Sequence, residues 1–317
     1  MTGRPGKTIL RRLWRVALVL AAGLLAGRLE AAQTPPTPLV GDAGCIDFWV
    51  ISTRHLPTYA NPAAALNQLA VWHREPSGWI AYRYEAFLAA IDTDVPVCFY
   101  LNGIFTSVGS ATADAQKLFA NMGAGLPPFR GVHWLWPSDF ERGVAPREQV
   151  NHALVRSQVE SFYLAATIQS LRNTPAVNMV GHSFGCQIAA DALARLGRCR
   201  GAEGALCGSH PMRIGAVLIA PTIPPASLLA GGQFEAALHL VDRLLVTHNR
   251  DDLALHIYEQ IQERPALGVS GLPVVMGGRP AKVMQVDAGP AVRFRHTAAT
   301  YFDSPLVVAW LRGFFAG

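Results

Sequence analysis

The stretch NTPAVNMVGHSFGCQIAADALARLGR, residues 173–198, changes its hydrophobic period in the middle. The run AVNMV near its start is typical of a buried strand, whereas the apolar residues after GHSFG recur every three or four positions, as on one face of a helix. A buried strand that runs directly into a helix is the repeating unit of sheets whose strands are parallel. The stretch therefore predicts a parallel sheet covered by helices.

The same alternation extends over most of the 317 residues. We expect strands over 45–53, 95–103, 131–138, 176–183, 213–221, 243–248 and 281–289. We expect helices over 84–91, 111–123, 147–173, 252–264 and about 304–315, and directly after GHSFG. Near-continuous apolar strands predict an α/β fold with a mostly parallel central sheet and helices on both faces. Residues 45–317 would form this one domain, in which 55–83 and 222–241 show no clear pattern and are candidate lid segments.

The N-terminal 32 residues have the layout of a secretory signal peptide. A basic start is followed by the apolar run Val16–Gly27 and by small residues at 31 and 32. Twelve apolar residues are fewer than the ~20 that span a bilayer, so the layout favours a cleaved signal over an uncleaved signal anchor. Residues 33–44, which begin QTPPTP, are expected to be a linker. We therefore expect a periplasmic or secreted protein, with membrane contact only through this segment if it is not cleaved.

The formal net charge of +5 belongs entirely to the N-terminal segment. Residues 1–31 hold six basic residues and one acid, so the rest of the chain is neutral. A neutral body gives no reason to expect nucleic acid as a partner. No Cys or Cys/His group has metal-ligand spacing, so the sequence implies neither a metal nor another cofactor.

The GHSFG turn fits the G-x-S-x-G nucleophile elbow, in which a serine occupies a sharp turn between a strand and a helix. The alternative is an ordinary glycine-rich turn whose serine caps the helix. A serine hydroxyl is a poor nucleophile unless a neighbouring base takes its proton, so Ser183 as nucleophile requires a histidine and a carboxylate. In proteins whose serine lies at a nucleophile elbow of this type, the acid and then the histidine follow the serine along the chain.

Two regions downstream of Ser183 meet this requirement. His296 is the histidine that follows the last expected strand, in the loop PAVRFRHTAATYFDSP. Asp251 and Asp252 follow the strand over 243–248, and one would orient His296 while the other would cap the next helix. The residues alone leave the choice between the two acids open.

An oxyanion hole needs two backbone N–H groups beside the nucleophile. The first is expected from Phe184, the residue after the serine. The second is expected from Ile104, since the loop after the strand over 95–103 turns tightly at Gly103. Asn102 would support this loop by hydrogen bonds or would be a plain loop asparagine.

Six segments follow one another in the order and spacing found in α/β-hydrolases: VPVCFYLNGIFTS, GVHWLWPSD, VNMVGHSFG, VLIAPTI, NRDDLAL and HTAATYFDSP. More narrowly, they resemble a bacterial esterase/lipase-like group of unknown function, with a His-Gly loop, a Trp-Pro-Ser strand end and an Ala-His-Ser-Met-Gly-type elbow. The resemblance covers about residues 84–316.

This resemblance implies an α/β-hydrolase fold with Ser183 as nucleophile and His296 as base. It also implies an Asp before the Ala-Leu step, which favours Asp252 over Asp251. Asn102 stands where the group usually has histidine, and Phe184 stands where methionine is common.

The leading hypothesis is a serine hydrolase that cleaves an ester or related acyl bond of a small-molecule or lipid-like substrate through an acyl-enzyme. Two alternatives stay open. The fold could serve as a non-catalytic binding or scaffold protein of the cell envelope, or the same triad could transfer the acyl group to an acceptor other than water.

Overall fold

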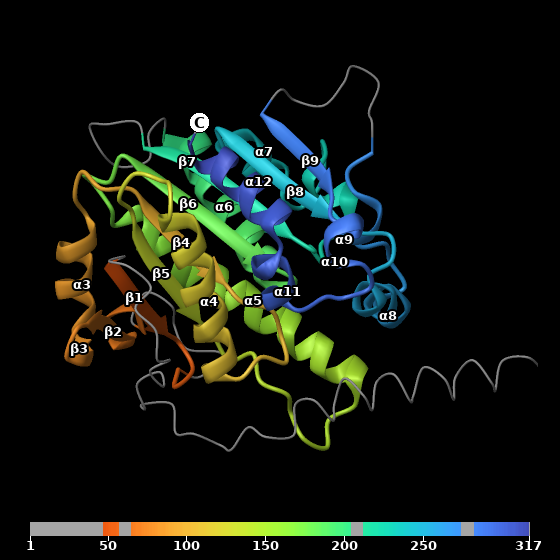
Figure 1. Ribbon diagram of the computed structural model, residues 1–317, viewed down its shortest axis with the longest axis horizontal. Coiled ribbons are helices and arrows are strands. Elements are labelled where there is room, and N and C mark those ends of the chain that lie inside the picture. The colour runs from red at the N-terminus through yellow and green to blue at the C-terminus, as the bar shows by residue number, and fades with distance from the viewer. Residues whose placement is uncertain (1–46, 57–64, 204–211, 274–281, 317) are drawn as a thin grey trace, which may run out of the picture. The chain divides into compact units, whose positions relative to one another are not determined.

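The computed structural model describes residues 47–56, 65–203, 212–273 and 282–316 (Figure 1). Contacts divide the chain into Met1–Thr34 and Pro35–Gly317, and every described residue belongs to the second unit. The expected signal segment over 1–32 and the linker over 33–44 lie outside the described residues.

Nine described strands form one sheet in the order β3-β2-β1-β5-β4-β6-β7-β8-β9. The strands are β1 (Asp47–Ser52), β2 (Ala70–Glu75), β3 (Gly78–Tyr82), β4 (Val97–Leu101), β5 (Arg130–Leu135), β6 (Ala176–His182), β7 (Arg213–Ile219), β8 (Arg243–His248) and β9 (Val283–Asp287). All neighbours from β1 to β9 are parallel, whereas β2 is antiparallel to both β1 and β3. The carboxyl ends of the parallel strands therefore share one edge of the sheet.

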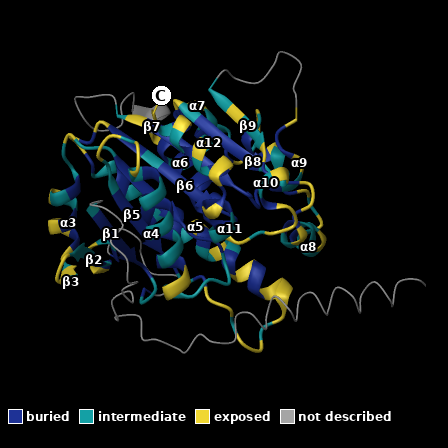
Figure 2. Ribbon diagram, viewed as in Figure 1, coloured by how far each residue is buried: buried dark blue, intermediate teal, exposed yellow. Residues whose placement is uncertain are grey.

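Helices cover both faces of this sheet (Figure 1). The described helices are α3 (Tyr84–Ile91), α4 (Val108–Gly123), α5 (Pro146–Gln169), α6 (Phe184–Glu203), α7 (Glu235–Leu240), α8 (Leu253–Gln262), α9 (Leu267–Ser270), α10 (Gly289–Val292), α11 (Ala298–Asp303) and α12 (Pro305–Ala316). Helices α4, α11 and α12 pack against one another on one face, and α5, α6 and α7 form a second layer. Figure 2 shows the central strands buried beneath these layers. The predicted α/β class, with a mostly parallel sheet and helices on both faces, is confirmed.

Parts of the two candidate lid segments form regular secondary structure. Residues 70–82 form the antiparallel strands β2 and β3 at one edge of the sheet, and three strands separate β2 from β6. In the second segment, residues 235–240 form α7, which packs against α6. Phe234 and Leu228 of that segment are buried in the core. Residues 70–75 and 78–82 therefore belong to the sheet and residues 235–240 to the helical layer, and residues 57–64 lie outside the described residues.

Candidate active site

Ser183 lies at the point where β6 passes into α6. Strand β6 ends at His182 and helix α6 begins at Phe184, so the turn between them is the serine alone. Its backbone has a φ of 54°, in the left-handed region that non-glycine residues rarely occupy. The N–H of Ser183 donates to the carbonyl oxygen of Ile219 at 2.9 Å, which holds this strained turn against β7.

The two glycines of the motif are required by close backbone contacts. A β-carbon at Gly181 would lie 2.7 Å from the backbone nitrogen of Cys186, inside van der Waals distance. A β-carbon at Gly185 would overlap the carbonyl oxygen of Leu101 at the end of β4. The glycines therefore let α6 start close to its own strand and to the neighbouring one.

Three side chains that are far apart in the sequence meet beside this turn. The Oγ of Ser183 lies 2.9 Å from Nε2 of His296, and Nδ1 of His296 lies 2.8 Å from Oδ2 of Asp252. Asp252 is fully buried and Ser183 is 5% exposed. The His296 side chain is 21% exposed, so the imidazole borders on solvent. Both imidazole nitrogens are thus within hydrogen-bond distance of a partner, as a proton relay requires.

The two aspartates after β8 differ from the expectation, in which one of them would orient His296 and the other would cap α8. Asp252 does both, because its Oδ2 contacts His296 while its Oδ1 accepts the N–H of Leu255 at 3.0 Å and caps α8. Asp251 points to solvent and contributes only its backbone N–H, which donates to Oδ1 of Asn249 at 3.0 Å. The structure therefore places Asp252, and not Asp251, beside the imidazole.

The loop that carries His296 is tied to the rest of the site by two further side chains. His182 contacts the backbone oxygen of His296 through Nε2 at 2.7 Å. Burial lowers the pKa of His182 to about 3, so the ring is neutral near pH 7 and donates through an Nε2–H. The buried amide of Asn249 donates to the backbone oxygen of Arg293. The sequence gives no sign of the role of Asn249, because its partner lies 44 residues away.

The residues expected to supply the oxyanion hole lie on both sides of Ser183. Phe184 is the first residue of α6, where an N–H has no partner inside the helix. Ile104 follows Gly103, and a β-carbon on that glycine would lie 3.1 Å from Cβ of Ser183. Among the described residues, the N–H groups of Phe184 and Ile104 donate to no protein acceptor. Within the described ranges, the two expected oxyanion donors are therefore left without a protein acceptor.

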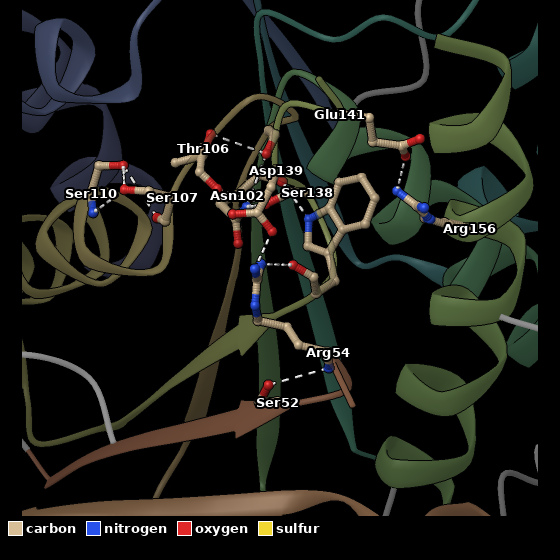
Figure 3. Close-up of polar contacts among 12 residues, drawn as sticks. Ser52, Arg54, Asn102, Thr106, Ser107, Ser110, Ser138, Asp139, Glu141 and Arg156 are labelled. Carbon is tan, nitrogen blue, oxygen red and sulfur yellow. Dashed lines mark hydrogen bonds and ion pairs between the residues drawn. The ribbon is translucent and has the colours of Figure 1, made fainter. Parts of the chain in front are cut away.

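A buried network supports the loop after β4 (Figure 3). Trp136 donates from Nε1 to the carbonyl oxygen of Asn102 at 2.9 Å, and the Asn102 amide donates to Oγ of Ser138 at 2.9 Å. Ser138 donates in turn to the carbonyl oxygen of Thr106 at 3.1 Å. The Trp-Pro-Ser strand end thus packs beneath this loop, and Asn102 is 1% exposed within it.

These observations decide the architecture. The serine follows β6 at a strand–helix turn, the acid follows β8 and the histidine follows β9, all at the carboxyl edge of a parallel sheet. The chain has the α/β-hydrolase fold. Among the described residues of this hydrolase fold, no group of three His, Cys, Asp or Glu side chains is placed to hold a metal ion. No helix within the same described ranges has the length and hydropathy needed to cross a bilayer.

Comparisons of the chain with known proteins give likenesses to solved structures at low identity. No protein-family model matches the chain, and no curated protein matches it. Among solved structures, esterase B from Lactobacillus rhamnosis is 12% identical, with 97% of this chain and 93% of that chain covered and a TM-score of 0.38. Carboxyl esterase 2 from the mycorrhizal fungus Tuber melanosporum is 12% identical, with 78% and 80% covered and a TM-score of 0.40. Lipase B of Aspergillus fumigatus is 13% identical, with 72% and 54% covered and a TM-score of 0.39.

Proposed function

We propose that the chain is a serine hydrolase that cleaves an ester or related acyl bond through an acyl-enzyme. The observation that carries this proposal is the continuous contact from the Ser183 hydroxyl through His296 to the Asp252 carboxylate, with 2.9 Å and 2.8 Å between the paired atoms. The arrangement matches what general-base activation of a serine requires.

In the proposed reaction, Oγ of Ser183 attacks the acyl carbon while Nε2 of His296 takes its proton. The Asp252 carboxylate accepts the Nδ1–H and stabilises the imidazolium that forms. The N–H groups of Phe184 and Ile104 donate to the oxyanion of the tetrahedral intermediate. His296 then gives the proton to the leaving group, and water repeats the sequence on the acyl-enzyme to regenerate the serine.

Hydrolysis of p-nitrophenyl butyrate by the purified chain tests this proposal. We expect Ser183→Ala and His296→Ala each to lower kcat by about 10⁴–10⁶-fold, because serine and base act as one unit. Circular dichroism checks that each variant is folded. Equal turnover by the parent chain and His296→Ala would instead favour the non-catalytic scaffold, and an acyl product formed on an added alcohol would favour acyl transfer.

We also propose a small-molecule or lipid-like ester as the substrate and an exported location for the protein. Support for export comes from the basic, apolar and small-residue order of residues 1–32. A panel of p-nitrophenyl esters of increasing acyl length defines the substrate class. N-terminal sequencing of the protein recovered from cell fractions tests export, since a mature chain that starts after residue 32 is expected and an intact leader in the cytosol would contradict it.

A further inference from the structure

The loop after β4 has an unusual distribution of hydrogen bonds. Its carbonyl oxygens at 102, 103, 104 and 106 each accept from a tryptophan, asparagine, threonine or serine side chain. Its N–H at Ile104, in contrast, donates to no described residue. Side chains therefore bind the acceptors of this loop, while the Ile104 N–H stays without an acceptor among the described residues.

The position of the Gly103 carbonyl determines the direction of the Ile104 N–H. Both belong to one planar peptide unit, in which the C=O and the following N–H point in opposite directions. The Asn102 amide donates to the Gly103 oxygen at 2.9 Å. The Thr106 hydroxyl lies 3.2 Å from the same oxygen and 3.2 Å from the oxygen of Ile104. A rotation of this peptide unit would break these bonds, so they hold the Ile104 N–H in one direction.

The side-chain amide of Asn102 has a donor beside its oxygen and two acceptors beside its nitrogen. His133 is fully buried, and burial lowers its pKa to about 3, so its ring is neutral. Its Nε2 lies 3.2 Å from Oδ1 of Asn102 and can donate to that oxygen. The amide nitrogen of Asn102 then faces the two acceptors, the Gly103 oxygen and Oγ of Ser138. A buried amide with all these partners has one orientation.

We propose that Asn102 and Thr106 are positioning residues that aim the Ile104 N–H at the oxyanion by holding the Gly103 carbonyl. The inference rests on the proposed hydrolase function and adds to it the residues that set the direction of one oxyanion donor. Neither side chain touches the substrate in this account. Asn102 occupies the position where the resembling group usually carries histidine.

Thr106→Val and Thr106→Ser form a matched pair for the test. Valine has the shape of threonine without the hydroxyl, and serine keeps the hydroxyl. We expect Thr106→Val to lower kcat for p-nitrophenyl butyrate about tenfold with KM unchanged, and Thr106→Ser to stay within about threefold of the parent chain. Asn102→Leu, which also removes the bond to Ser138, should lower kcat about 100-fold, near the range found when an oxyanion donor is removed. Ser107→Ala is the control, because the Ser107 side chain bonds with Ser110 and, among the described residues, with no carbonyl at 102–106.

A trifluoromethyl ketone of matching acyl length separates positioning from general loss of structure, because its adduct with the serine carries an oxyanion. We expect its inhibition constant to rise in Thr106→Val by the factor by which kcat/KM falls. Full activity of Thr106→Val, or a lower kcat with an unchanged inhibition constant, overturns the proposal, even if Asn102→Leu fails to fold. A parent chain that hydrolyses esters while Thr106→Val is unaffected refutes only the positioning roles; an inactive parent chain refutes the hydrolase function as well.

Discussion

The two loops that flank Ser183 are built differently. The loop over 102–107 is held from beneath by buried polar side chains of neighbouring elements, and it begins at the fully enclosed end of β4. The loop over 289–297, which carries His296, exposes Arg293 and Arg295 and leaves Phe294 57% exposed. The side chains of His182, Asn249 and Asp252 contact this loop, and Asp287 accepts the N–H of Gly289 where it begins.

This difference corresponds to the tasks that we propose for the two loops. A fixed dipole stabilises a developing charge only if its direction is set before the reaction, which requires a backbone held by many bonds. A general base exchanges a proton with two different oxygens, so it needs a partner on its far nitrogen more than a rigid loop. The comparison predicts that damage to the His296 loop acts on proton transfer, whereas damage to the first loop acts on oxyanion stabilisation and on the fold.

The largest effect on kcat is expected from a change of Asp252, the carboxylate that contacts His296. Asp252→Asn should lower kcat about 10⁴-fold. An amide neither stabilises the imidazolium nor holds the neutral ring in the required tautomer. Asparagine still caps α8, so the thermal midpoint should change little. The matched variant Asp251→Asn should keep kcat within about twofold, and equal losses in the two variants would contradict the assignment of Asp252.

At the base of the loop over 102–107, Gly185→Ala should lower the stability of the fold. The new β-carbon would overlap the Leu101 carbonyl at the base of the first loop, which forces β4 and α6 apart. Overpacking of this kind costs about 1–3 kcal/mol of unfolding free energy. Gly313→Ala in α12 is the control, since nothing lies within 4 Å of its added carbon and the change should stabilise by about 0.5–1 kcal/mol. Urea unfolding of both variants measures the difference, and equal midpoints would show that Gly185 is not needed for packing.

A pH-dependent stability difference is expected for His182→Gln. The native pKa of His182 is about 3, below the usual 6.5, so between these pH values the unfolded chain binds a proton that the native chain does not. The parent chain therefore loses stability as the pH falls below 6.5. The variant has no titrating group at position 182 and does not show this loss. Between pH 7 and pH 5 the stability difference should move in favour of the variant by about 2 kcal/mol, as measured by urea unfolding at each pH. A difference independent of pH would show that His182 titrates normally.

The smallest effect concerns the link from His182 to the His296 loop. His182→Leu removes the donor to the His296 oxygen and should lower kcat about tenfold with KM unchanged. His182→Gln places an amide nitrogen near the position of Nε2 and should recover most of this loss. If leucine and glutamine variants have the same kcat, the hydrogen bond does not hold the loop.

The comparison also shows what sequence patterns can and cannot reveal. The strand–Ser183–helix turn was predictable because the hydrophobic period changes across it, and His296 because it follows the last strand. The residues alone leave the choice between Asp251 and Asp252 open, since adjacent carboxylates both suit a helix start; only the family resemblance favours Asp252. The catalytic roles of Ser183, Asp252 and His296 stay predictions.

Other features depend on contacts that no local pattern records. Strands β2 and β3 were missed because, at the sheet edge, only Val71 and Trp72 of their residues are buried. The support of the first loop joins Asn102 to His133 and Ser138, which are 31 and 36 residues away. Such partners are brought together by the fold and not by a period in the sequence.

The most direct test of the central claim is the intact mass of the chain after reaction with a fluorophosphonate. The account predicts one phosphonyl adduct per chain, located on the peptide that contains Ser183, with no adduct in Ser183→Ala and at most slow labelling in His296→Ala. A folded chain that gains no adduct, or one labelled on another residue, would contradict the account.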